Sequence, residues 1–156
     1  MTLYTSIKFI HILSICMMVG ATLCNGVLHL SAIKSGSVNF IHITLKNIMK
    51  INQVIMAPSF VLLIISGLYM TGIAHLSFNA LWLKASLILT IILVIEFIYG
   101  YKMENKLESI ALDSLQKKHH KIQPSYWRQF KLAAPIGSSA TLFSFIIIYL
   151  MIVKPA

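Results

Sequence analysis

The chain has 156 residues, of which 58% are hydrophobic and only 11% are charged. An ordinary soluble domain carries about 25% charged residues, so this composition excludes a typical soluble fold and favours one membrane domain over residues 1–156. The sequence also lacks glycine-rich phosphate loops, HExxH and CxxC, which excludes common nucleotide-binding and zinc enzymes. The net charge of +9 needs no nucleic acid as partner, because anionic lipid headgroups attract basic segments.

Four apolar stretches are each long enough to cross a hydrocarbon core of about 30 Å. They cover residues 6–30, 53–74, 81–101 and 132–153. In lipid the backbone has to satisfy its own hydrogen bonds, and these stretches do not alternate as barrel strands do. The predicted fold class is therefore all-α, a four-helix transmembrane bundle.

The first stretch, residues 6–30, contains two histidines, His11 and His29. It is too long for the core of a signal peptide and has no basic leader, so we expect a retained helix. The histidines are 18 residues apart, which is close to five turns and places both on one face, roughly 27 Å apart along the axis.

Two cysteines, Cys16 and Cys24, lie on the same predicted helix. Their separation of eight residues is about 12 Å along the axis and exceeds disulfide reach, so we expect them to be small packing residues. Together with Gly20 they place small residues four apart, which favours a homodimer interface.

The predicted basic loop 31–52 contains Asn39, which we expect to cap the second helix, so that this helix begins in the loop and enters the membrane near Gln53. Pro58 lies inside the second span, residues 53–74, and predicts a kink. A short connection leads to the third span, so we expect the second and third helices to be antiparallel neighbours.

The second predicted basic loop covers residues 102–131. Its first part carries apolar residues at helical spacing: Met103, Leu107, Ile110 and Leu115. We therefore expect the third helix to continue beyond the membrane as an amphipathic extension that ends before Pro124. We interpret His119 and His120, within a run of basic residues, as solvated surface.

The distribution of charge predicts the orientation. Ten basic residues lie in the two loops: Lys34, Lys46, Lys50, Lys102, Lys106, Lys117, Lys118, Lys121, Arg128 and Lys131. The other side holds only Lys8, Lys84 and Lys154. The positive-inside rule then places both loops in the cytoplasm and both termini on the opposite side of the membrane.

Ionisable side chains at membrane depth are costly, so each is a candidate functional residue. The topology predicts an outer group of His11, His75 and Lys84. Imidazole ligates haem iron in helix bundles, which suggests a haem at this group. A copper site on His11 is a second interpretation, and simple helix packing is a third.

The topology also predicts an inner pair, His29 and Glu96, with His42 or Asn52 nearby. An ionised carboxylate in hydrocarbon costs roughly 2.5–3.5 kcal/mol on insertion scales. We therefore expect Glu96 to be protonated, paired with His29, or exposed to a water-filled cavity. Proton transfer and a structural hydrogen bond are its two alternative roles.

Four short motifs carry a resemblance to known families: "IKFIHILSICMMVGATLC", "SGLYMTG", "LWLKASLIL" and the closing "YLMIVKPA". Over nearly its whole length the chain resembles the bacterial four-helix membrane family called domain of unknown function 2269. This resemblance implies a multi-pass protein of a bacterial inner membrane, with both termini on the periplasmic side. More distantly it is similar to HemJ-type protoporphyrinogen oxidases and CopD-type copper-resistance proteins. The HemJ resemblance implies that His11 ligates haem b, that Lys84 acts near a porphyrin, and that Lys154 and Pro155 match a closing Lys-Pro.

The sequence thus predicts a membrane protein that binds haem b through His11, His75 and Lys84, with a redox or haem-pathway role. Two alternatives stay open: a non-enzymatic scaffold or subunit of a larger complex, and copper handling across the membrane with His11 as metal ligand. The expected partners are membrane lipids and a second copy or another membrane subunit.

Overall fold

The structure is a computed structural model that describes residues 3–118 and 122–154. Its elements are α1 (Leu3–Ser35), α2 (Val38–Ile51), the π-helical turn η1 (Asn52–Met56), α3 (Ala57–Ile73), α4 (Leu81–Gln116) and α5 (Pro124–Val153). The positions His119, His120, Lys121 and Pro155, for which the sequence made predictions, lie outside the described residues.

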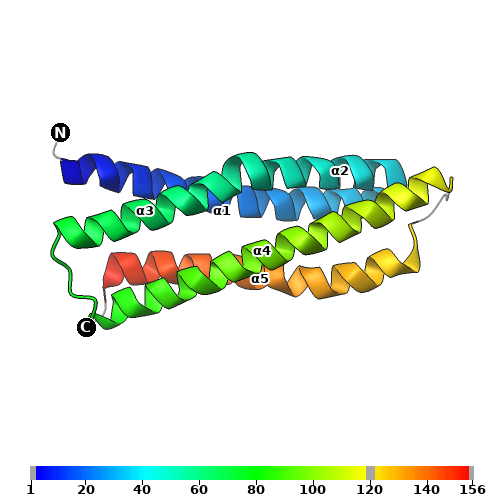
Figure 1. The fold of residues 1–156 in the computed structure, drawn as a ribbon. Coiled ribbons are helices and arrows are strands. Elements are labelled where there is room, and N and C mark those ends of the chain that lie inside the picture. Colours follow the sequence, from blue (N-terminus) through cyan, green and yellow to red (C-terminus); the bar gives the residue numbers. More distant parts are fainter. Residues whose placement is uncertain (1–2, 119–121, 155–156) are drawn as a thin grey trace.

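Elements α2, η1 and α3 follow one another without a break, so the chain forms four long rods (Figure 1). Each rod is long and apolar enough to cross a membrane. The described residues contain no strand. The prediction of an all-α fold with four membrane-spanning helices is therefore confirmed.

The two ends of the bundle differ in charge. Figure 1 shows both termini and the α3–α4 connection at one end, which we call the terminal end. The α1–α2 and α4–α5 connections lie at the other end, which we call the basic end. Exposed cations there include Lys34, Lys46, Lys106, Lys117 and Lys118. The side of the membrane that each end faces stays a prediction.

The helices extend well beyond the predicted spans at the basic end. The 36 residues of α4 make a helix of about 54 Å, which exceeds a hydrocarbon core of about 30 Å. The expected amphipathic extension of this helix is confirmed, since Met103 and Leu107 are buried. The predicted loops 31–52 and 102–131 are thus largely helical.

The N-cap of α2 differs from the prediction. Ser37 has extended backbone angles, and its Oγ accepts a hydrogen bond from the backbone N–H of Phe40. An N-cap residue needs such a non-helical backbone, whereas Asn39 already lies inside the helix.

The irregularity expected at Pro58 takes the form of the π-helical turn η1, directly before the proline. Proline has no N–H to donate to the preceding turn. The backbone N–H of Ala57 instead reaches back to the carbonyl of Asn52, which is the five-residue spacing of a π-helix. This wide turn brings Asn52 into the interior, where it is 4% exposed.

The helices pair differently from the simplest expectation. Helix α1 packs on α3 and α2, while α4 packs on α5 and α2. The second and third rods are neighbours mainly where α2 contacts α4, and α3 meets α4 where the rings of Phe60 and Phe97 lie 5.2 Å apart between centroids. The seven residues 74–80 permit this arrangement, because a chain of that length reaches about 24 Å and does not force α3 against α4 along its length.

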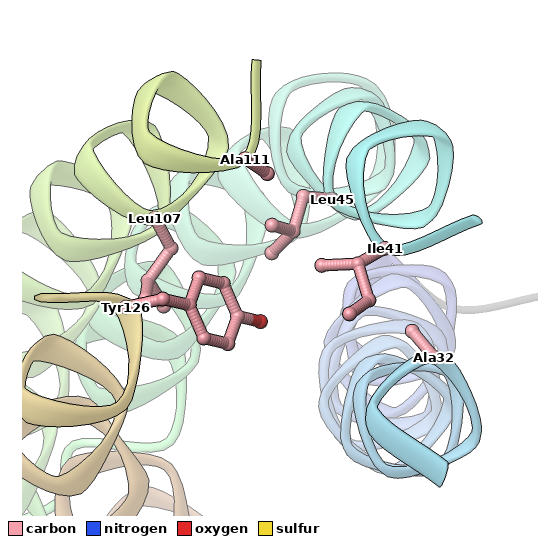
Figure 2. Packing of buried hydrophobic residues seen from close by; sticks show 6 residues of the cluster. All are labelled: Ala32, Ile41, Leu45, Leu107, Ala111 and Tyr126. Carbon is pink, nitrogen blue, oxygen red and sulfur yellow. The ribbon is translucent and has the colours of Figure 1, made fainter. Parts of the chain in front are cut away.

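Two apolar clusters stabilise the bundle. The cluster near the basic end consists of Ala32, Ile41, Leu45, Leu107, Ala111 and Tyr126 (Figure 2). Figure 2 shows the ring of Tyr126 reaching from α5 toward the side chains of α2 and α4. A second cluster, built on Met18, Phe60 and Leu93, holds the middle of the bundle together. The candidate site lies between these two clusters.

Candidate functional site

A cavity of about 440 Å³ lies between α1, η1, α4 and α5. Its lining is mostly apolar and includes members of both clusters, such as Met18, Leu93 and Leu107. A few larger polar side chains also face it: Asn25, His29, Asn52, Glu96, Tyr101 and Glu104. Pockets for small molecules have this volume and this mixture, since roughly 300–1,000 Å³ of mostly apolar space is typical.

The first polar feature is a chain of three side chains from three elements. Nδ2 of Asn25, on α1, donates to Oδ1 of Asn52 over 2.7 Å. Nδ2 of Asn52 donates to Oε2 of Glu104, on α4, over 2.5 Å. The π-helical turn places the bridging Asn52, and π-helical turns are frequent at functional sites. The network therefore joins α1 to α4 beside the cavity.

The second polar feature is Glu96, which lies two turns before Glu104 on the same face of α4. Its Oε1 accepts a hydrogen bond of 2.7 Å from Oγ of Ser139, on α5. Its Oε2 is buried and has no hydrogen-bond partner among the described residues. Oδ1 of Asn25 is also buried and has no hydrogen-bond partner among the described residues, although Nδ2 of the same side chain donates to Asn52. Both unpartnered atoms are acceptors.

The third polar feature is His29, toward the basic end of the cavity. Its Nε2 lies 3.0 Å from the hydroxyl of Tyr126, and its ring packs on Phe130 at 5.0 Å between centroids. The predicted inner residues His29 and Glu96 thus line one cavity, although each has a partner on α5. Asn52 lies in the same cavity, whereas His42 pairs with Glu108 over 3.2 Å between α2 and α4.

The cavity opens sideways between α1 and α5. On α1 its exposed rim includes Leu23, Val27 and Leu30, and on α5 it includes Ala134 and Ser138. These residues belong to the apolar stretches of two membrane-spanning helices. The opening therefore faces the lipid.

The outer group predicted from the sequence is arranged differently. Nδ1 of His11 lies 2.9 Å from Oγ of Ser66, on α3. Its ring lies so close to Gly67 that a Cβ added there would be 3.1 Å from Cε1. This histidine thus has a partner and close packing between α1 and α3. It does not line the cavity.

His75 and Lys84 are exposed at the terminal end. Nζ of Lys154 lies 5.6 Å from the centroid of the Trp82 ring, a cation–π contact between α5 and α4. Within residues 3–118 and 122–154, no three His, Cys, Asp or Glu side chains come together as a metal site would require. The roles of His11, His75 and Lys84 toward haem stay predictions.

Sequence reasoning named His29, Glu96 and Asn52 but overlooked Asn25, Glu104 and Tyr126. Helical spacing could have found two of them. Asn25 precedes His29 by four residues and Glu104 follows Glu96 by eight, so each pair shares a helix face. Tyr126 lies in a segment expected to be a loop, where the sequence gives no such signal.

The fold and the cavity define a class: a polytopic helical membrane protein with a mostly apolar cavity that holds a few polar side chains. The comparisons with known proteins then give the family. The model of the family described as "Predicted integral membrane protein (DUF2269)" matches residues 5–155, so the chain belongs to this family. No curated protein and no solved structure matches the chain.

Proposed function

We propose that this protein binds a small amphipathic cation within the membrane. The observation that carries the proposal is that the cavity offers hydrogen-bond acceptors and carboxyl groups without matching donors or cations. The two buried unpartnered atoms of the cavity, Glu96 Oε2 and Asn25 Oδ1, are acceptors, and a second carboxyl group, Glu104, lines the same cavity. The described lining contains no lysine or arginine. A ligand in this cavity would therefore supply the donors and the positive charge.

The apolar walls support the second half of the proposal. A buried charge is stabilised only by an opposite charge or by several hydrogen bonds, which a cationic head beside Glu96 would provide. The body of the ligand would lie against apolar walls such as Phe60, Leu93 and Phe97. The opening between α1 and α5 would admit the ligand directly from the lipid.

A binding experiment with two probes of equal shape and opposite charge tests the proposal. The protein is placed in lipid nanodiscs and titrated with tetraphenylphosphonium and with tetraphenylborate, with empty nanodiscs as the background. We expect saturable binding of the cation and none of the anion. Anion binding of equal affinity, or absence of saturable cation binding, would contradict the proposal.

Replacement of one carboxyl group sharpens the experiment. Glu96→Gln keeps the shape of the side chain but removes its negative charge. Because hydrogen bonds to charged groups contribute about 1.5–3 kcal/mol, the affinity for the cation should fall at least about tenfold. Glu108→Gln is the matched control on the same helix, since Glu108 pairs with His42 and does not line the cavity. Equal losses in both variants would contradict the role of Glu96.

The same preparation decides between this proposal and the roles expected from the sequence. A haem-b band in the reduced-minus-oxidised spectrum that disappears in His11→Ala would replace the proposal with the haem role. Bound copper in elemental analysis would favour metal handling. A protein that is colourless, contains no metal and binds neither tetraphenylphosphonium nor tetraphenylborate would favour a scaffold or a subunit of a larger complex.

A further inference from the structure

The seven glycines of the chain serve different purposes. Gly36 has a positive φ of 66° in the turn between α1 and α2, where other residues are strained. Gly67 permits the close approach of His11. Three others, Gly26, Gly100 and Gly137, line the cavity, and a Cβ added at any of them meets no atom within 4 Å. Helix packing does not require these three glycines.

The three cavity glycines come from three different helices. Gly26 lies on α1, Gly100 on α4 and Gly137 on α5, so they face the same space from three directions. Gly100 lies midway between Glu96 and Glu104, at the spacing of one helical turn from each. Glycine in a helix interior is also less favourable than alanine. The three positions therefore leave space open where a side chain would fit.

We infer that Gly26, Gly100 and Gly137 determine ligand size, because they keep the cavity wide enough for a bulky body beside the carboxyl groups. This inference rests on the proposed function and adds a ligand class. We expect compact, branched or multi-ring cations to bind more tightly than linear amines, which fill less of the cavity. A Cβ at any of the three positions meets no atom of a neighbouring helix, so a side chain there would occupy open space at the cavity.

A comparison of two cations tests this inference. The probes are tetraphenylphosphonium, which is bulky, and decylammonium, which is linear. In Gly100→Val and in Gly137→Val we expect the affinity for the bulky cation to fall about tenfold, because the added valine side chain would overlap the space that this cation needs. In the same two variants, the affinity for the linear cation should change by less than about threefold.

The matched control is Gly20→Val, on α1. A Cβ at Gly20 also meets no atom within 4 Å, but Gly20 does not line the cavity. This variant should bind both cations as the unchanged protein does. Thermal unfolding gives a readout without ligand, and the three valine variants should unfold within a few degrees of one another.

The outcomes separate this inference from the function on which it rests. If the unchanged protein binds neither cation, the proposed function fails and the inference fails with it. If it binds both and the valine variants lose them in equal proportion, only the role of the glycines is wrong. If Gly100→Val or Gly137→Val unfolds far below Gly20→Val, these glycines serve packing, and the inference is also wrong.

Discussion

Two regions of this bundle hold polar side chains at membrane depth, and these side chains are packed closely in one region but line a cavity in the other. Between α1 and α3, His11 is bonded to Ser66 and packed on Gly67. Between α1, η1, α4 and α5, a cavity separates the helices, and two buried acceptor atoms lack partners among the described residues. Similar residue types thus serve close packing in one region and leave an open pocket in the other.

The role of an intramembrane polar residue thus depends on its surroundings and not on its residue type. A polar group in lipid is costly unless it has a partner. The hydrogen bond between His11 and Ser66 therefore gives both side chains a structural role in helix packing. An unpartnered acceptor beside a cavity, such as Glu96 Oε2, has no such structural explanation, and it is the atom that the proposed cation would contact. The following variants test this contrast, beginning with the largest expected effect.

The packed region should be most sensitive at Gly67. In Gly67→Val the added side chain would meet the ring of His11, so we expect a loss of about 3 kcal/mol in the free energy of unfolding. Titration with a denaturing detergent, followed by circular dichroism, measures this loss. Gly72→Val on the same helix is the control, because a Cβ there meets nothing within 4 Å. Similar losses in both variants would contradict the close contact with His11.

The cavity region should be most sensitive at Asn52. In Asn52→Ala both Asn25 and Glu104 lose a hydrogen-bond partner, and we expect a loss of about 2 kcal/mol. The same unfolding titration measures it. Asn47→Ala, at an exposed position on α2, should have little effect. A stability of Asn52→Ala equal to that of the control would show that the bridge between α1 and α4 contributes nothing.

A smaller effect is expected at Tyr126, whose ring is fully buried. Tyr126→Phe keeps the packing shown in Figure 2 and removes only the hydroxyl group that contacts His29. We expect a loss of about 1 kcal/mol, with Tyr149→Phe at an exposed position of α5 as the control. An unchanged unfolding midpoint would mean that the contact with His29 does not stabilise the fold.

The smallest effect is expected at Ser66. Hydrogen bonds between transmembrane helices contribute about 0.6 kcal/mol on average, so Ser66→Ala should cost about that much. Ser59→Ala is the matched control, since Ser59 is also buried on α3 but bonds only the carbonyl of Ile55 in its own rod. A loss several times larger in Ser66→Ala would indicate that His11 has a role beyond packing.

Part of this architecture could be predicted from the sequence because the bilayer imposes it. Apolar length gave four spans, and the spacing of Met103 and Leu107 gave the extension of α4. The partners of the helices could not be predicted, because a short connection limits only how far apart two helix ends lie. The N-cap at Ser37 was missed for a similar reason, since Asn39 is an equally suitable residue type whose backbone is helical.

The order of the amino acids alone establishes the class of protein, the number of spans and which polar residues at membrane depth need an explanation. These follow from composition and hydropathy, which are properties of the chain one segment at a time. The tertiary structure decided that His11 packs against α3 while His29, Glu96 and Glu104 share a cavity with glycines from three helices. Such a grouping depends on how rotated and inclined helices meet across long sequence distances, and no single segment contains that information.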